Sequence, residues 1–217
     1  MTGKKTEDKV IQLGPQRRSA KLYQAIGRFT VAYEHTTDAV CYCIKNLLSE
    51  QGLTNEDVAT VFVGHMAAAP LRDTLQSLFA ICRPDDKFGQ RVLADLLKQL
   101  QRHSQVRNRV IHGAWTIRHD KSTASEGEIY AESATEKRTK AGVRSDYLRA
   151  DEPFFASQTG IAEDIGYKLM LFGVILEVRT PIEVWFEFDS KGALRLSKKA
   201  KEQRTKNADE KVYEWSW

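Results

Sequence analysis

Apolar residues recur at intervals of three and four positions along most of this chain, a spacing that is typical of helices with one buried face. The segments that follow this pattern are residues 17–49, 54–79, 85–112 and 157–179. Pro70 lies inside the second segment and is expected to kink or break it, because proline lacks a backbone N–H and clashes with the preceding turn. Short links between the first three segments favour antiparallel neighbours. The pattern therefore predicts a mainly α fold, an up-and-down bundle of four to five helices.

Two parts of the chain show the alternation of apolar and polar residues that is typical of strands. Residues 114–150 carry the strand-like runs Trp115–Arg118 and Glu128–Tyr130, which predict a small β-hairpin, with an ordered loop as the alternative, inserted before the last long helix. Farther on, Ile182–Phe188 alternates strictly and a turn signal follows at Asp189–Gly192. We therefore expect a C-terminal hairpin, with a fifth helix as the alternative.

Composition adds few constraints. The chain has 217 residues, enough for a sizeable core, and a formal net charge of +4. No apolar run approaches the ~20 residues that a membrane-spanning helix needs, so we expect a cytoplasmic protein without a membrane partner. We divide the chain into a flexible N-terminal arm at 1–16, a helical bundle at 17–180 that contains the insertion 114–150, and a C-terminal hairpin with a basic tail at 181–217.

The end of the third helix carries the residues with the most chemistry, in the run Arg107-Asn108-Arg109-Val110-Ile111-His112-Gly113. Arg107 falls in the apolar stripe of this helix, where a guanidinium without a partner would be strongly unfavourable. Glu34 and Asp38, one turn apart on the first helix, are in the right element to form a salt bridge with it. Gly113 then ends the helix, as glycine does where the chain turns into a left-handed conformation.

His112 adds a proton carrier to this fixed cation, because imidazole titrates near neutral pH and guanidinium does not. Asn108 and His112 share one face of the helix, roughly 100–140° away from Arg107. Arg107 and His112 therefore need either a distorted last turn or a second copy of the chain to reach one pocket. The alternative interpretation is that both cations complement the dipole at the helix C-terminus.

The pattern Arg107-Asn108-x-x-x-His112-Gly113, at the end of the third helix, resembles the signature of HEPN domains. These are small helical bundles found in RNases, toxin–antitoxin pairs and other prokaryotic defence proteins. The resemblance implies a dimer with the motif in a cleft between two protomers. It also implies that His112 is the acid/base, that Arg107 binds phosphate and stabilises the transition state, and that Asn108 is a polar positioning residue. The flanking helices match in pattern only, over about residues 17–180, and the family also contains members with no catalysis.

Two hypotheses about function follow from this resemblance. In the first, the protein is a metal-independent endoribonuclease that cleaves RNA by attack of the 2′-hydroxyl at a dimer-interface site. It would then act as a toxin or defence effector, with an antitoxin protein as a further partner. In the second, it is a non-catalytic dimeric binding module for a nucleotide, RNA or a protein. Neither hypothesis calls for a cofactor or a metal ion.

Basic residues follow the motif and crowd the C-terminal part of the chain. We expect Arg109, Lys137, Arg138 and Lys140 to bind RNA, because lysine and arginine neutralise backbone phosphates. Both basic segments also contain acidic residues, so an ordinary solvated surface is the alternative.

Overall fold

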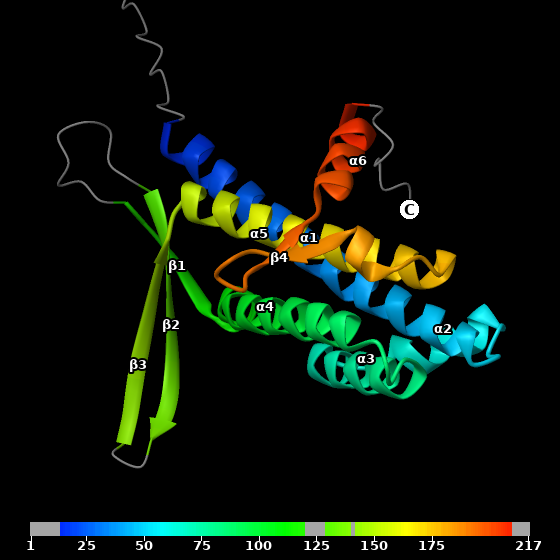
Figure 1. The fold of residues 1–217 in the computed structure, drawn as a ribbon. Coiled ribbons are helices and arrows are strands. Elements are labelled where there is room, and N and C mark those ends of the chain that lie inside the picture. The colour runs from blue at the N-terminus through cyan, green and yellow to red at the C-terminus, as the bar shows by residue number, and fades with distance from the viewer. Residues whose placement is uncertain (1–13, 120–128, 140–141, 210–217) are drawn as a thin grey trace, which may run out of the picture. The chain divides into compact units, whose positions relative to one another are not determined.

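The computed structural model describes residues 14–119, 129–139 and 142–209, and it is mainly helical, as the pattern predicts (Figure 1). The helices are α1 (Gly14–Glu50), α2 (Glu56–Gly64), α3 (Ala68–Cys82), α4 (Lys87–His112), α5 (Glu152–Val178) and α6 (Lys198–Asp209), with a 3-10 turn η1 (Ile182–Val184). The strands are β1 (Ala114–His119), β2 (Ile129–Thr139), β3 (Gly142–Ala150), β4 (Phe186–Phe188) and β5 (Leu194–Leu196). Most of the predicted N-terminal arm lies outside the described residues.

Backbone contacts divide the chain into two compact units. The larger unit comprises residues 31–107 and 159–217, and the smaller unit comprises residues 1–30 and 108–158. The division falls inside α1, α4 and α5, so each of these helices contributes residues to both units. It also falls between Arg107 and Asn108, so the motif has residues in both units.

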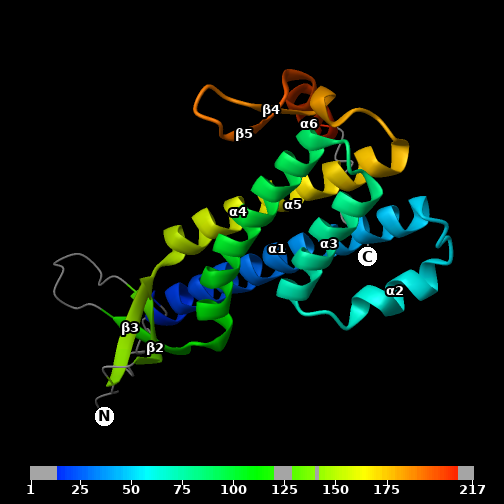
Figure 2. The same ribbon diagram turned by 60° about the horizontal axis from the view of Figure 1, so that its bottom comes forward.

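The core of the larger unit forms where apolar stripes of α1, α3, α4 and α5 face one another. Its side chains include Ile44, Leu75, Leu96 and Phe172, each fully excluded from solvent. Burial of such a side chain contributes about 1.5–3 kcal/mol to stability. The β4–β5 hairpin adds side chains of both strands to the same core. Figure 2 shows α3 and α4 running side by side in this unit.

The smaller unit is organised around a cluster of aromatic rings. Phe155 of α5 has ring neighbours in Phe29 of α1 at 6.2 Å and Trp115 of β1 at 6.0 Å. The indole N–H of Trp115 donates to the carbonyl of Val110, 2.5 Å away, and so holds the start of β1 against the last turn of α4. These contacts fix the point at which the helix carrying the motif gives way to the sheet.

The predicted hairpin is confirmed as the antiparallel pair β1–β2, but the insertion also contains a third strand and forms a sheet of order β1-β2-β3. β1 pairs with residues 129–134 of β2, and β3 pairs with residues 131–139. Beyond residue 134 the strands β2 and β3 pair only with each other and form a long two-stranded extension, which we call the ribbon (Figure 1). The third strand was missed because residues 142–150 mix polar and apolar positions without clear alternation.

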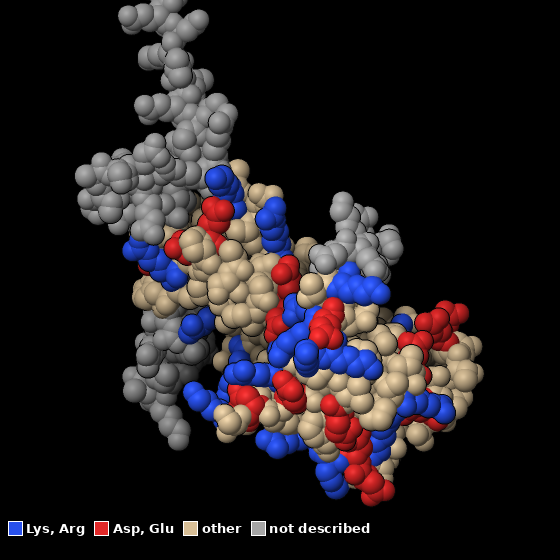
Figure 3. Space-filling model, turned by 45° about the horizontal axis from the view of Figure 1, so that its top comes forward, with Lys and Arg blue, Asp and Glu red and all other residues tan. Residues whose placement is uncertain are grey.

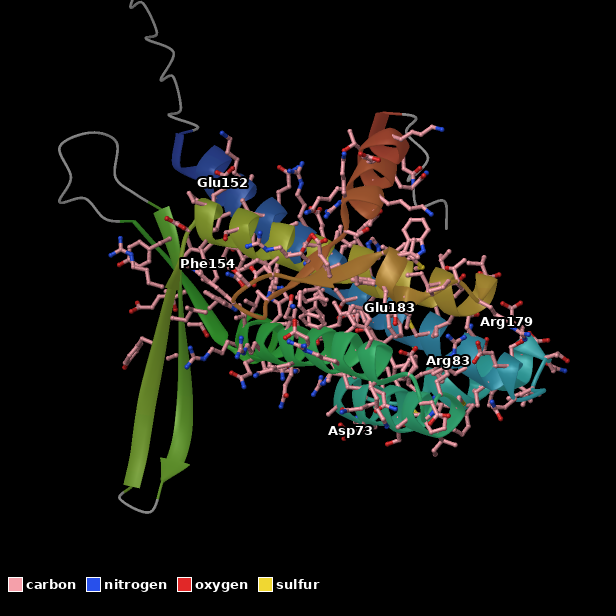
Figure 4. The ribbon with its side chains drawn as sticks, in the orientation of Figure 1. Asp73, Arg83, Glu152, Phe154, Arg179 and Glu183 are labelled. Atoms are coloured by element: carbon pink, nitrogen blue, oxygen red, sulfur yellow. The ribbon has the colours of Figure 1, made fainter. Side chains whose placement is uncertain are left out.

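The predicted break in the second segment is confirmed, but two predicted helix boundaries were wrong. The second segment is two helices separated at residues 65–67, and Pro70 lies in the first turn of α3, where its missing N–H costs no helical hydrogen bond. The last long helix begins at Glu152 instead of residue 157, because the carboxylate of Asp151 accepts a hydrogen bond from the Phe154 N–H at 2.8 Å. Figure 4 labels Glu152 and Phe154 at this helix start.

The C-terminal hairpin is present but shorter than predicted. Only Phe186–Phe188 and Leu194–Leu196 pair as strands, and Ile182–Val184 forms the turn η1. The basic stretch that follows is helix α6, which was missed because it has no apolar stripe: within it, Ala200 alone of the described side chains is a buried hydrophobic. The hairpin, and not the alternative of a fifth helix, is therefore what forms from the alternating segment, and α6 follows it.

Candidate functional site

Arg107 is held by two residues of α1 within the larger unit. Its Nη2 lies 2.8 Å from Oε1 of Glu34, which confirms the salt bridge to the first helix. The same guanidinium lies over the ring of Tyr33, 5.5 Å from the ring centroid, a cation–π arrangement. The side chain of Arg107 is 25% exposed and that of Glu34 is 48% exposed. The guanidinium is therefore fixed in direction and still within reach of solvent.

Behind this ion pair lies a buried hydrogen-bond network that joins α1, α3 and α4. The Tyr33 hydroxyl and Ser104 Oγ are 2.7 Å apart, and Ser104 also donates to the Leu100 carbonyl at 2.8 Å. A serine hydroxyl has a single proton, so Tyr33 must then be the donor to Ser104. Arg72 of α3 donates to the same oxygen at 3.3 Å. This network fixes Tyr33, on which Arg107 rests, and ties α3 to the helix that carries the motif.

His103 supports the same aromatic residue. It is 4% exposed, and its ring centroid lies 6.1 Å from that of Tyr33. The histidine is therefore a core residue of the larger unit, which excludes it as a solvent-facing acid or base.

His112, Asn108 and Arg109 belong to the last turn of α4 in the smaller unit. The side chains of His112 and Asn108 are exposed, and that of Arg109 is half-buried. His112 is the last residue of the helix, and the N–H of Gly113 closes the final turn by donating to the Arg109 carbonyl at 3.1 Å. The imidazole is thus presented to solvent on a helix end that is well defined.

Gly113 does end α4, but the expected left-handed conformation was wrong. Among the described glycines, a positive φ occurs at Gly52 and Gly192 and not at Gly113. Glycine is required there because a Cβ would overlap the hydroxyl of Ser133 on β2 and would lie 2.5 Å from the Arg109 carbonyl oxygen. The close approach of the sheet to the helix end is what excludes a side chain.

The predicted RNA-binding residues other than Arg109 fall on the ribbon. Lys137 and Arg138 are residues of β2, where Lys137 is opposite Arg144 and Arg138 is opposite Val143 in the antiparallel register. Lys140 lies outside the described residues. The register thus places Lys137 and Arg144, two basic residues of the sequence, at opposite positions of the two strands.

Charge on the rest of the surface is mixed. On the face shown in Figure 3, Lys and Arg are interspersed with Asp and Glu. In α6, Lys201 lies 3.7 Å from Glu187, and Arg204 lies 2.8 Å from Asp164, so the basic tail is partly neutralised. Across residues 14–119, 129–139 and 142–209, no three His, Cys, Asp or Glu side chains gather as a metal-binding group. Within those same ranges, every helix is too short or too polar to cross a membrane.

Comparisons with known proteins give no family for this chain: no protein-family model, curated protein or solved structure matches it. The resemblance to HEPN domains therefore depends on the motif from Arg107 to Gly113 alone.

Sequence analysis missed Tyr33, Ser104 and Arg72, although it found both members of the ion pair. Tyr33 immediately precedes Glu34, and Ser104 lies one turn before Arg107, a spacing at which helix side chains are neighbours. A polar residue one turn from a cation in an apolar stripe was therefore a usable signal. The sequence held no comparable signal for Arg72, because its contact with Ser104 joins two separate helices.

Proposed function

We propose that the chain is a metal-independent endoribonuclease that acts as a homodimer, with Arg107, Asn108 and His112 as its catalytic residues. The observation that carries the proposal is the contrast between two side chains of one helix. Arg107 is half-buried and held by Glu34, whereas His112 is exposed at the helix end. A cation that is already fixed needs little reorganisation when charge develops in a transition state. An exposed imidazole is able to exchange a proton with a substrate.

The reaction needs only these groups and the 2′-hydroxyl of RNA. His112 takes the 2′-hydroxyl proton, the 2′-oxygen forms a bond to the adjacent phosphorus, and the bond to the 5′-oxygen breaks. The departing 5′-oxygen receives a proton from water, the hydroxide that remains takes the proton from His112, and the other product ends in a 2′,3′-cyclic phosphate. Arg107 neutralises charge on the pentacoordinate phosphorus, and Asn108 orients His112 or binds a phosphate oxygen. DNA is inert because it lacks the attacking hydroxyl.

The dimer completes the site in this proposal. Arg107 and His112 are five residues apart on α4, and an α-helix turns about 100° per residue, so one copy presents them on different faces. A second copy brings its own motif to the first, as the resemblance to HEPN domains implies. A role as a toxin or defence effector, restrained by an antitoxin protein, fits the same resemblance.

The ribbon supports binding of a polyanion. Between Glu136 and Asp146 every charged residue of the sequence is basic, and Lys137 and Arg144 form one cross-strand pair. An isolated two-stranded ribbon is marginally stable in water, so a bound partner would stabilise it. RNA phosphates would neutralise these cations, and we assign Arg109, Lys137, Arg138 and Lys140 to RNA binding on this ground.

A second function is favoured by one observation, the ion pair itself. Glu34 already occupies Arg107 within a single chain, as a structural arginine would be occupied. On this account Arg107 and His112 stabilise the helix end and a dimer interface, and the protein binds a nucleotide, RNA or protein partner without cleaving it. Absence of RNA cleavage by the wild type, together with loss of the dimer in Arg107→Ala, would favour this function.

The test compares cleavage of a labelled RNA, in the presence of a chelator, by the wild type, His112→Ala and His65→Ala. His65 is a matched control because it is an exposed histidine at the end of another helix, α2. We expect the wild type and His65→Ala to cleave alike and His112→Ala to be slower by about 100-fold or more. Equal rates for His112→Ala and the wild type, or complete loss of activity in chelator, would contradict the proposal.

A further inference from the structure

A polar hollow lies between α3 and α4 in the larger unit, with a volume of about 130 Å³. Its polar lining comes from both helices: Arg72, Asp73 and Gln76 of α3, and Lys98 and Gln101 of α4. Figure 4 labels Asp73 on α3. The hollow therefore combines two cations and two carboxamides with a single carboxylate, and its polar groups are mostly hydrogen-bond donors.

One of the two cations is held in place by the buried network. Arg72 donates from Nη1 to Ser104 Oγ, and Ser104 is fixed by Tyr33 and the Leu100 carbonyl. Arginine presents its donors in a planar fork that matches the geometry of a phosphate. Lys98 is exposed and adds a second positive charge on the facing helix. A preorganised guanidinium opposite a lysine is the arrangement that binds a compact oxyanion.

The hollow is connected to Arg107 along α4. Lys98, Gln101 and Ser104 follow one another at intervals of three residues, and Arg107 is three residues farther on, so each side chain neighbours the next. A second connection passes through contacts, from Arg72 to Ser104, then to Tyr33, whose ring carries Arg107. Ser104 and Tyr33 are buried and already paired, so they hold Arg72 and Arg107 in place, and Lys98 and Gln101 are the exposed donors of the hollow on α4.

We propose that this hollow binds a phosphate group, with Arg72 and Lys98 as its cations and Gln76 and Gln101 as neutral donors. The group is a backbone phosphate of the RNA strand whose scissile phosphate contacts Arg107, an assignment that rests on the proposed ribonuclease function. A free nucleotide offers the same chemistry and is the other source. Asp73 opposes the anion and limits the affinity of the site.

The test measures the dissociation constant of a short fluorescent RNA at 0.15 M salt, where the Debye length is about 8 Å and remote charges are screened. His112→Ala is the background, so that the RNA stays intact. Lys98→Ala is expected to weaken binding about threefold to fivefold, the range for one partly exposed charge. Asp73→Asn is expected to strengthen binding by a similar factor. Arg102→Ala is the matched control, since it removes one exposed cation of the same helix that does not line the hollow.

A parallel titration with adenosine monophosphate separates the two sources of phosphate. Opposite effects of Lys98→Ala and Asp73→Asn on RNA, with Arg102→Ala unchanged, support the RNA assignment. The same pattern for the mononucleotide alone supports the phosphate site and assigns it to a free nucleotide. Equal affinities for all variants, or equal losses in Lys98→Ala and Arg102→Ala, would overturn the site. Cleavage by the wild type is measured separately. The ribonuclease proposal and the phosphate site in the hollow can therefore be refuted independently of each other.

Discussion

Arg107 of α4 and Glu34 of α1 form an ion pair of 2.8 Å between residues 73 positions apart in the sequence. The pair fixes the position of the guanidinium that the motif supplies. Its contribution to stability is small, at most about 1 kcal/mol, because both side chains are partly exposed. Its importance lies in the direction that it gives to Arg107.

Replacing the carboxylate of Glu34 separates its contribution to stability from its effect on the position of Arg107. We expect Glu34→Gln to lower kcat for RNA cleavage about tenfold, because Arg107 loses its fixed position. KM should not rise, since the change also removes a negative charge near the RNA phosphates. Steady-state kinetics check this, with circular dichroism melts to show that the fold is kept. A raised KM with unchanged kcat would mean that Glu34 acts in RNA binding alone.

The junction between α4 and the sheet gives a second prediction. Gly113→Ala should destabilise the protein by about 1–3 kcal/mol, because the added methyl overlaps Ser133 and the Arg109 carbonyl. Gly160→Ala is the matched control: it lies inside α5 with no atom within 4 Å of the added methyl. Alanine there should stabilise by about 0.5–1 kcal/mol through its helix preference. Urea unfolding measures both, and equal effects of the two substitutions would refute the packing argument.

The buried hydrogen-bond network of Tyr33 and Ser104 gives a third prediction. Tyr33→Phe removes the donor to Ser104 and should cost about 1 kcal/mol of unfolding free energy. Tyr23→Phe, on the same helix but 63% exposed, should change it by less than about 0.5 kcal/mol. Chemical denaturation measures the free energy of unfolding of both variants. If Tyr33→Phe were neutral, the network would have no energetic role.

The contact between α5 and α6 makes a prediction about pH. Burial alone would raise the pKa of Asp164, but hydrogen bonds from Lys168 and Arg204 and their positive charges lower it below the ordinary value. A carboxylate with a lowered pKa stabilises the folded state above the pKa of the unfolded chain, about 3.9, and loses this contribution as pH falls. Asp164→Asn should therefore be less stable than the wild type at pH 7.

The difference between Asp164→Asn and the wild type should shrink as pH falls below the ordinary carboxyl pKa, and it should disappear once pH is below the lowered pKa of the folded state, where the wild-type carboxyl is protonated as well. Melting temperatures across this pH range provide the measurement. A difference that persists at low pH would show that the charge of Asp164 is not what stabilises the contact. If the ion pair stabilises the contact, the destabilisation of the double variant Asp164→Asn/Arg204→Gln at pH 7 should be no larger than the sum of the two single destabilisations.

Local signals in the sequence were sufficient for the parts of the fold that are governed by nearby residues. The third segment was expected to start at residue 85, where carboxylates suit a helix cap, and Asp86 does accept a hydrogen bond from the Gly89 N–H at 2.6 Å. Asp151 was an equally good capping signal that was passed over. Glu34 was identified as a partner of Arg107 because a cation in an apolar stripe demands a partner on a packed helix.

Features that depend on distant pairing left no such signal. Strand β3 is held by its register with β2, and its own residues show no period of two. The hydrogen bond of Arg72 to Ser104 joins α3 to α4, and no spacing in the sequence reports it. Gly113 was explained by the wrong cause because a close approach by Ser133 cannot be seen from neighbouring residues. The motif and its partner Glu34 were visible in the sequence, but the contacts that Tyr33 makes with Arg107 and Ser104 became visible only in the folded chain.

The identity of the ends that cleavage leaves tests the central claim most directly. An RNA of defined sequence and a matched strand with a single 2′-deoxy nucleotide at the mapped cleavage position are incubated with the wild type, and the products are analysed by mass spectrometry. The account predicts 2′,3′-cyclic phosphate and 5′-hydroxyl ends from the RNA, and no cleavage at the deoxy position. Ends with 3′-hydroxyl and 5′-phosphate groups, or cleavage at the deoxy position, would contradict it.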